Sequence, residues 1–551
     1  MRFAVVQVCF LATLVLPLSA ADDVVMRAMR DELARSMKDL KLEKLEKPYF
    51  ISYRVLDRSQ LGASATFGAL QGGNLGRSRF VVVQVRVGDY QRDNSNFFTY
   101  PMHANGLNET AALPLDDDYQ ELRRQFWLAT DAAYKSAVET LAKKRAALEN
   151  RTTREDLPDF THEEPSSVQE SCPPVKLDLP AAEALVRKLS SLFREQPEIE
   201  ASQVNLELRD THSWYVNSEG SATTREDTEA TLVAAAETQA TDGMLLPDWI
   251  TFAGRSLEEL PKQDAMASEV RGMAERLTRL RQAPLVDRYN GPVLFAGSAG
   301  AEIFGQVVAP KFLAMRTPAS DSPQFETYAA QAASKFQDRI GARVLPAFLS
   351  VADDPTQTSF QGTQLRGNHQ VDEEGVKSRP VKLVDKGVLK TLLVTRDPVT
   401  HVPQSTGSFR TFGAQPSNLI VSVEDGKSAA ELQSELLSLV KQRDAGYGIL
   451  VRRVGREIYR IYPDGHQELA RQGTFDGLDD TAFKNLEAAS KDLTVYTIPF
   501  SAVGGRIFPG QTGAPLVSFV VPSLLFEDLT LKPASVELPK LPLSKHPYFD
   551  K

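Results

Sequence analysis

The stretch between Gly291 and Pro310 combines a strand pattern, a turn pattern and a helix pattern in direct succession. The apolar run 293–295 indicates a buried strand. Gly297, Ser298 and the residues up to 300 favour a turn, and the pattern from 301 to 308 predicts a helix that ends before Pro310. We therefore expect this strand–helix unit to begin the second domain of the chain.

The predicted helix has one apolar face and one polar face. The apolar positions, which we expect to lie in the core, are Ile303, Phe304, Val307 and Val308. Glu302 and Gln306 are four residues apart, share a different face and are candidates to point into a cleft. A carboxylate in the first turn of a helix lies near the positive end of the helix dipole, which favours its ionised form.

This helix resembles the His-Glu-x-x-x-His helix of the TldD/PmbA family of metallopeptidase relatives. In that alignment Ala301 and Gln306 stand at the two His positions, and Glu302 stands at the Glu position. The resemblance implies that the family's two His bind a metal, that a later Cys adds a ligand, and that the Glu is a general base. Both His are replaced here and no Cys follows Cys172, so we expect no zinc bound by the family's ligands.

Further segments carry the same resemblance over roughly residues 200–530, and they match a branch that is secreted and has a degenerate metal helix. They are 217–220 (Asn-Ser-Glu-Gly), 372–376 (Asp-Glu-Glu-Gly-Val), 385–389 (Asp-Lys-Gly-Val-Leu), 405–407 (Ser-Thr-Gly), 416–418 (Pro-Ser-Asn) and 510–515 (Gly-Gln-Thr-Gly-Ala-Pro).

The N-terminus has the pattern of a secretory signal peptide. Arg2 precedes an apolar run at 3–18, and small residues follow up to Ala21. We expect residues 1–21 to be removed, which places the protein in the periplasm or outside the cell, with no membrane span in the mature chain. Only Cys172 then remains, so no intramolecular disulfide can form.

The charge of the chain argues against nucleic-acid binding. The formal net charge is −9, and it becomes about −10 once Arg2 is removed with the signal peptide. Lys and Arg residues are scattered, whereas binding to phosphates needs concentrated positive charge.

Length and hydrophobic pattern predict an α+β protein with two domains, because 551 residues are too many for one ordinary core. The N-terminal domain, 22–285, is expected to place helices on an antiparallel sheet, with a Pro-rich linker or surface excursion at 151–180. Gly72, Gly73 and Asn74 are expected in a loop. Helices are predicted at 22–40, 116–148, 181–195 and 266–280, and strands at 49–55, 81–87, 204–208 and 214–216, the last two as a hairpin or meander.

The C-terminal domain, 286–531, is expected to be β-rich, and a Pro-rich tail follows at 532–551. Turn patterns at 372–375, 385–387 and 463–465 indicate hairpins. Strands are predicted at 419–423, 448–451, 458–462, 494–499 and 516–522.

Two other kinds of site are compatible with the sequence. Ser298 lies between a strand and a helix, as the nucleophile of a serine hydrolase does, with His369, His401 or His466 as its base. The same three His, with Glu302, are the residues from which a dispersed metal site would be built. The hairpins of the second half argue against the parallel sheet of an α/β-hydrolase.

The resemblance implies a protein that handles peptides or unfolded protein segments, as a homo-oligomer or with a metal-bearing relative as its partner. Our first hypothesis is an exported, metal-free, PmbA-like subunit of such a peptidase, in which Glu302 is the candidate catalytic residue. The second hypothesis is a non-catalytic peptide-binding or assembly protein that kept the fold. The third is a serine hydrolase that uses Ser298.

Overall fold

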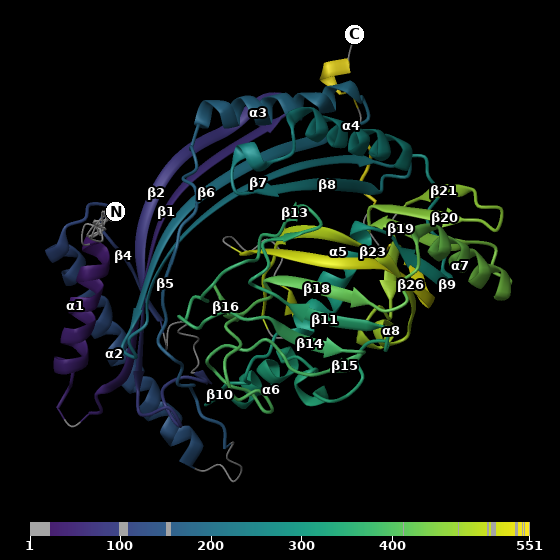
Figure 1. Ribbon diagram of the computed structural model, residues 1–551. Helices are drawn as coiled ribbons and strands as arrows, with labels where there is room; N and C mark the ends of the chain where they lie inside the picture. The colour runs from purple at the N-terminus through teal and green to yellow at the C-terminus, as the bar shows by residue number, and fades with distance from the viewer. Residues whose placement is uncertain are drawn as a thin grey trace, which may run out of the picture.

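The computed structural model describes residues 23–43, 45–98, 108–149, 156–411, 413–471, 473–503, 506–507, 514–534, 538–542, 544 and 546–549. An N-terminal sheet of seven strands arches over a C-terminal domain that is built on a sheet of eleven strands (Figure 1). The predicted signal peptide, 1–21, lies outside the described residues. No helix in the described part of the chain is long and apolar enough to cross a membrane.

The arch consists mainly of long antiparallel strands in the order β4-β2-β1-β6-β7-β5, with β8 also paired to β7. Only β5 runs parallel to its neighbour, β7. The strands are β1 (Pro48–Thr66), β2 (Ala69–Val87), β4 (Asn108–Ala112), β5 (Ser167–Glu170), β6 (Ala201–Asn217), β7 (Ala222–Gln239) and β8 (Leu245–Gly254).

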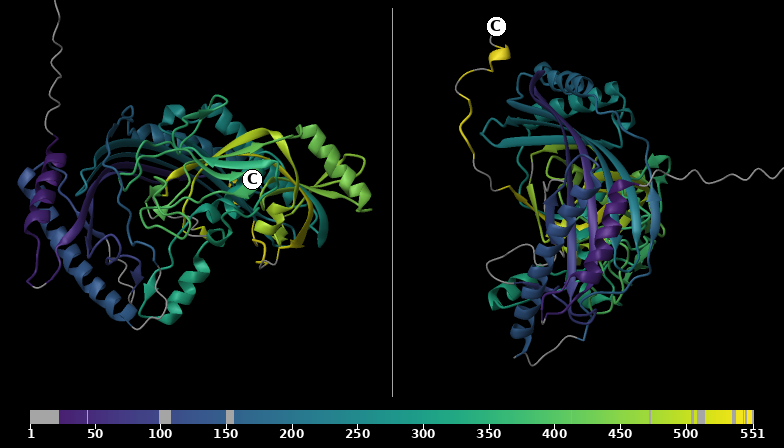
Figure 2. Two further views of the ribbon diagram at one scale, coloured as in Figure 1. Left: turned by 60° about the horizontal axis from the view of Figure 1, so that its bottom comes forward. Right: turned by 90° about the vertical axis from the view of Figure 1, so that its left-hand side faces the viewer.

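Four helices cover the outer face of the arch in two pairs (Figures 1 and 2). The helices α1 (Val24–Asp39) and α2 (Tyr119–Glu149) bury one apolar cluster against β1, β2 and β6. The helices α3 (Leu179–Ser191) and α4 (Gln263–Leu280) bury a second cluster at the other end of the strands. The inner face of the arch faces the C-terminal domain.

The C-terminal sheet is organised around β26 (Leu516–Pro533), which pairs with β9, β18, β22 and β23. Its strand order is β15-β14-β11-β18-β26-β9-β19-β20-β21. The other strands are β9 (Tyr289–Phe295), β11 (Leu349–Asp353), β14 (Val381–Asp385), β15 (Val388–Leu389), β18 (Asn418–Val423), β19 (Gly448–Arg453), β20 (Glu457–Ile461), β21 (Gln467–Ala470), β22 (Gly473–Asp476) and β23 (Leu486–Pro499).

Helices and short strand pairs complete the C-terminal domain. The helices are α5 (Ser298–Val307), α6 (Pro323–Ala332), α7 (Ala429–Gln442) and α8 (Asp480–Lys484). The short pairs are β3 (Phe97–Phe98) with β10 (Ala319–Ser320), β12 (Ser359–Phe360) with β13 (Thr363–Gln364), β16 (Phe409–Arg410) with β17 (Gly413–Ala414), and β24 (Ala502–Val503) with β25 (Arg506–Ile507).

The structure confirms the α+β class, the long helix predicted at 116–148, the helix at 266–280 and the strand–helix unit at 293–308. The hairpin predicted from 204–208 and 214–216 is wrong, because both segments belong to β6. The polar residues between them, Asp210 and His212, cross a seam between the two apolar clusters of the outer face, so the apolar pattern stops while the strand continues.

The loop predicted at Gly72–Asn74 is also wrong, because these residues lie within β2 and pair with β1. Their small size has a packing reason. A Cβ atom on Gly73 would lie 2.4 Å from the Glu183 carboxylate and 3.3 Å from Leu179, both on α3. Small residues therefore let α3 pack closely on the strand.

The Pro-rich segment 151–180 is a structural part of the fold over its described residues, 156–180, and not the surface linker that its composition indicates. β5 joins the arch there. Phe160 is only 1% exposed and lies between the guanidinium groups of Arg86, 3.5 Å from its ring centroid, and Arg396, 3.9 Å from it. Arg86 belongs to the arch and Arg396 to the C-terminal domain, so the segment joins the two.

Candidate functional site

Small residues place α5 directly against the central strand of the C-terminal sheet. Gly297, just before the helix, has φ 57°, a backbone conformation that favours glycine. A Cβ atom on Gly300 would lie 2.3 Å from the Pro522 carbonyl oxygen. Gly297 therefore allows the turn before Ser298, and Gly300 allows the close packing of the helix on the strand.

The three positions of the family's metal motif have different environments on α5. Ala301 is completely buried in the core. Gln306 is exposed on the surface of the helix. Glu302 is 8% exposed. The face that Glu302 and Gln306 share on the helical wheel thus runs from a buried contact to open solvent, rather than along one cleft.

Glu302 is held by the turn between β19 and β20. Its Oε1 accepts a hydrogen bond from Arg456 Nη2 at 2.7 Å, and its Oε2 accepts one from the Val454 N–H at 3.1 Å. Burial raises the pKa of Glu302, while Arg456 and the Val454 N–H act in the opposite direction. Burial thus opposes the ionised form that its place on the helix favours, and Arg456 is the cation that balances its charge.

Arg456 extends this contact into the N-terminal domain. Its Nη1 donates to the Trp249 carbonyl oxygen at 2.9 Å, and its guanidinium lies 4.1 Å from the centroid of the Trp249 ring. Asp248 Oδ1 lies 3.6 Å from Arg456 Nη1, and Asp248 Oδ2 binds Arg276 at 2.5 Å. The acid of α5 is therefore the end of a chain of charges that joins α5 to β8 and α4 across the domain boundary.

The residues present do not fit the zinc site that the family implies. A zinc site needs three or four His, Cys or carboxylate ligands on rigid supports. Here one His position is an alanine packed in the core, the other is a surface glutamine, and both oxygens of Glu302 are bound by Val454 and Arg456. Among the described residues, no group of three or more His, Cys, Asp or Glu could hold a metal ion.

The histidines considered for other sites do not gather around Ser298 or Glu302. His369 is buried, and its Nδ1 lies 2.9 Å from the Gly367 carbonyl oxygen. His401 is exposed, and His466 pairs with Asp464 at the surface. In the described part of the chain no hydrogen bond connects Ser298 to a histidine. The thiol of Cys172, which is half-buried, lies 3.9 Å from the Thr228 hydroxyl.

Several of the segments that carry the family resemblance meet at the domain junction. Glu219 binds both Arg396, at 2.7 Å, and the hydroxyl of Tyr90, at 2.7 Å. In the turn 372–375, Glu373 forms an ion pair with Arg54 of the arch, and Glu374 accepts a hydrogen bond from the Arg396 N–H at 3.0 Å. These motifs therefore fix the contact between the domains. The segment 510–515 lies largely outside the described residues.

The sequence did not point to Arg456, Asp248 or Arg276. Arg456 is 154 residues from Glu302, and Asp248 belongs to the other domain. The one local signal is a turn with three arginines, Arg452, Arg453 and Arg456, which by itself resembles an ordinary charged turn.

Comparison with known proteins relates the C-terminal domain to a protein family. Residues 288–533 match the family model described as the PmbA/TldA metallopeptidase C-terminal domain. Among curated proteins, none matches the sequence.

Solved structures with the same fold cover nearly the whole chain. A proposed modulator of a DNA gyrase from Thermotoga maritima is 14% identical, with a TM-score of 0.60 over 92% of this chain and 99% of that one. TldE from Thermococcus kodakarensis is 13% identical, with a TM-score of 0.58 over 92% and 100%. A similar proposed modulator from Bacteroides thetaiotaomicron is 12% identical, with a TM-score of 0.57 over 93% and 98%.

At such identities the structural likeness establishes the fold, and the family model establishes the C-terminal domain. Residues 288–533 therefore match the PmbA/TldA metallopeptidase C-terminal domain, and the chain as a whole shares its fold with TldE and the two proposed modulators.

Proposed function

We propose that this protein is an exported, metal-free member of the family that binds peptides or unfolded protein segments and does not hydrolyse them on its own. The observation that carries the proposal is the ion pair between Glu302 and Arg456. This ion pair engages the Glu302 carboxylate, which in a metal-binding relative would act on a metal-activated water. Ala301 and Gln306 stand at the two His positions of the same helix.

A metalloprotease glutamate works by taking a proton from a water that the metal has made acidic. Without the metal ligands, Glu302 has no such water, because the fall in the pKa of water comes from the ion. Both oxygens of the Glu302 carboxylate are also already hydrogen-bonded, one to a guanidinium and one to a backbone N–H. Peptide hydrolysis that involves this protein would then require a metal-bearing relative as its partner.

The edge of the arch next to this ion pair supports the binding of an extended peptide. β8 is at an edge of the arch and pairs only with β7 among the described strands. Edge strands bind extended peptides through backbone hydrogen bonds. Trp249 on β8 is 42% exposed and carries the Arg456 guanidinium on its ring, so it offers an aromatic surface at that edge.

The test measures binding and cleavage of the same unfolded substrate by the mature protein. We expect labelled casein peptides to bind and to remain uncleaved, with or without a chelator. Cleavage that a chelator abolishes would contradict the metal-free assignment. Cleavage that resists the chelator and disappears in Ser298→Ala would favour the serine hydrolase. Failure to bind any unfolded peptide would contradict the proposal as a whole.

A further inference from the structure

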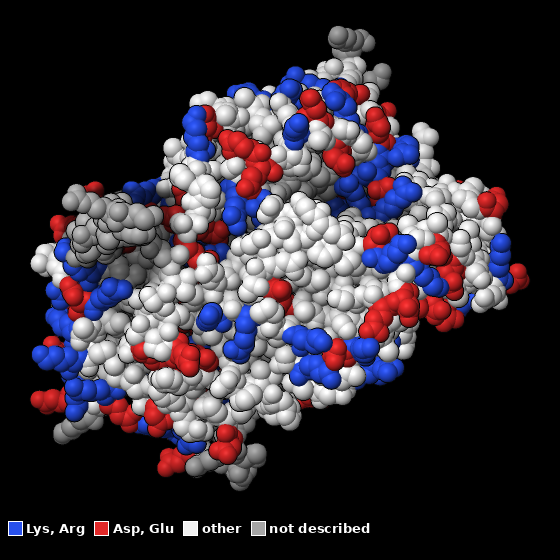
Figure 3. Space-filling model, in the orientation of Figure 1, with Lys and Arg blue, Asp and Glu red and all other residues white. Residues whose placement is uncertain are grey.

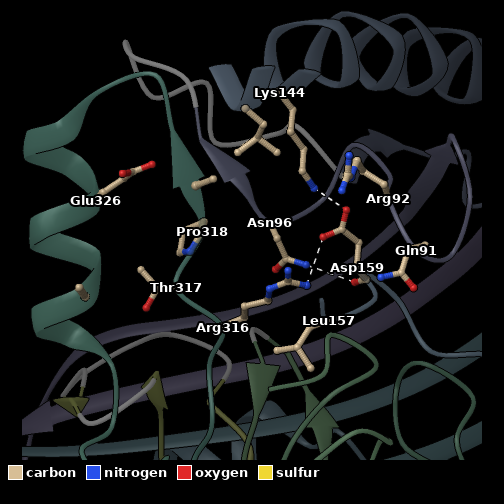
Figure 4. Close-up of a pocket in the computed structure, with 13 residues that line it drawn as sticks. Gln91, Arg92, Asn96, Lys144, Leu157, Asp159, Arg316, Thr317, Pro318 and Glu326 are labelled. Atoms are coloured by element: carbon tan, nitrogen blue, oxygen red, sulfur yellow. Dashed lines mark hydrogen bonds and ion pairs between the residues drawn. The ribbon is translucent and has the colours of Figure 1, made fainter. Parts of the chain in front are cut away.

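A polar cavity lies between the N-terminal and the C-terminal domain, away from α5. It has a volume of about 340 Å³ and is lined by residues of α2, of the turn after β2, of the segment 157–159, and of the stretch from Arg316 to α6 (Figure 4). It shares no lining residue with the ion-pair chain of Glu302.

The cations in this cavity outnumber its carboxylates. Among the described residues that line the cavity, Arg92, Lys144 and Arg316 are cationic and Asp159 and Glu326 are anionic, which leaves one positive charge in excess. A cavity with a single excess positive charge favours a monoanion as its ligand.

Two of the cations are fixed by Asp159, and the third is not. Lys144 Nζ binds Asp159 Oδ2 at 2.5 Å and the Ser95 carbonyl oxygen at 2.6 Å, and Arg316 Nη1 lies 3.2 Å from Asp159 Oδ1. The guanidinium of Arg92 has no hydrogen-bond or ion-pair partner among the described residues. An ammonium carries three N–H donors, and Asp159 and the Ser95 carbonyl oxygen accept two of those of Lys144, so one donor remains for a ligand.

The other walls carry apolar residues beside the polar Gln91, Asn96 and Thr317, and the cavity opens onto a groove. Leu148 and Leu157 line it from the N-terminal domain, and Pro318, Ala319 and Ala330 line it from the C-terminal domain. Gln91, Arg92 and Leu148 also line a shallower groove along the last turns of α2. A chain whose end lies in the cavity therefore has a path along that groove.

We propose that this cavity binds the C-terminal residue of a peptide, with the terminal carboxylate on Arg92 and Lys144 and an apolar last side chain against Leu148 and Leu157. The guanidinium forms paired, charge-assisted hydrogen bonds with a carboxylate. Capture of a terminal carboxylate is a recurrent way to recognise peptides. This inference rests on the proposed function, because it assigns an end of the peptide to a place on the protein.

The test compares two versions of one short fluorescein-labelled peptide that ends in leucine, one with a free carboxylate and one amidated. Fluorescence anisotropy with the mature protein measures both affinities. We expect the free carboxylate to bind at least about tenfold more tightly, the ratio typical for the loss of one charge-assisted hydrogen bond. Arg92→Gln should reduce this preference by weakening binding of the free-carboxylate peptide.

Two further variants separate the cavity from general effects. Arg124→Gln removes an exposed arginine from the same helix, α2, outside the cavity, and should keep the full preference. Ala330→Trp places a large side chain at an exposed position of the cavity wall and should weaken binding of the free-carboxylate peptide.

The outcomes for the cavity and for peptide binding are distinguishable. Equal binding of both peptides, or an unchanged preference in Arg92→Gln, would overturn the carboxylate pocket and leave peptide binding standing. If neither peptide binds while casein peptides do, the pocket is again overturned. If no peptide binds at all, the proposed function falls with it.

Discussion

At the scale of single residues, the environment of Glu302 carries the proposal that this chain is metal-free. The acid remains in place on α5, yet its partners are Arg456 and a backbone N–H rather than a metal-bound water. A buried carboxylate is tolerated only when its charge is balanced, and here Arg456 provides that balance.

Replacing Arg456 should therefore destabilise the protein more than replacing Glu302. Arg456→Met leaves the Glu302 carboxylate buried without its ion-pair partner, and we expect a loss of about 3 kcal/mol in the free energy of unfolding, measured by urea denaturation. Glu302→Gln should cost less, because it removes the charge. The double variant should recover part of the loss of Arg456→Met. An Arg456→Met variant as stable as the wild type would contradict this role.

Glu374 at the domain junction should make stability depend on pH. Burial, the Asp372 carboxylate and the Asp397 carboxylate raise its pKa above the ordinary value of 4.5, while Arg396 lowers it. The folded state then binds more protons than the unfolded state, so the stability from this group is complete below that ordinary value. It is lost as the pH rises through the raised pKa.

Glu374→Gln isolates that contribution, because glutamine imitates the protonated acid. Between about pH 5 and about pH 9 the melting temperature of the wild type should fall more steeply than that of Glu374→Gln. Parallel curves for the two proteins would show that Glu374 titrates as an ordinary surface acid.

At the scale of elements, the sequence predicts those parts of the fold whose apolar pattern is continuous. The helices α2 and α4 follow from periodicity because each buries one apolar stripe, whereas α5 buries every residue from 299 to 305. The sequence indicates two strands in place of β6, because the outer face of β6 crosses a polar seam at Asp210 and His212. Where the covering helices change, the pattern in a strand breaks although its hydrogen bonds continue.

The candidate site was predictable only in part, for a similar reason. Local sequence places Glu302 at the start of a helix, but its partner follows 154 residues later and the next charges lie in the other domain. Contacts of that range depend on how the arch covers the C-terminal domain, which no local pattern encodes. The composition of the Pro-rich segment predicts a linker or surface excursion, whereas Phe160 within it is a core residue.

Phe160 should thus be essential for the contact between the domains. It is buried between Arg86 and Arg396 and packs edge-on against Phe50, with ring centroids 5.0 Å apart. Phe160→Ala removes these contacts and should lower the free energy of unfolding by about 3 to 5 kcal/mol in urea titrations. Phe160→Leu keeps most of the volume and should cost less. If the two variants matched the wild type, the segment would be the surface linker that its composition indicates.

At the scale of the whole molecule, the two domains are connected by charge pairs as well as by packing. Arg396 with Glu219, Arg86 with Asp397, and Arg456 with Asp248 each join residues of different domains. On the face shown in Figure 3, acidic and basic side chains lie in small neighbouring groups around a largely uncharged centre. The two domains thus form one scaffold, and α5 takes part in the contact between them through Glu302, Arg456 and Asp248.

The most direct test of this account is the zinc content of the mature protein after incubation with excess zinc and gel filtration, measured by mass spectrometry of the metal. The account predicts far less than one zinc per chain, in the wild type and in Glu302→Gln alike. One zinc per chain that is lost in Glu302→Gln would show that the acid of α5 binds a metal, and would contradict the account.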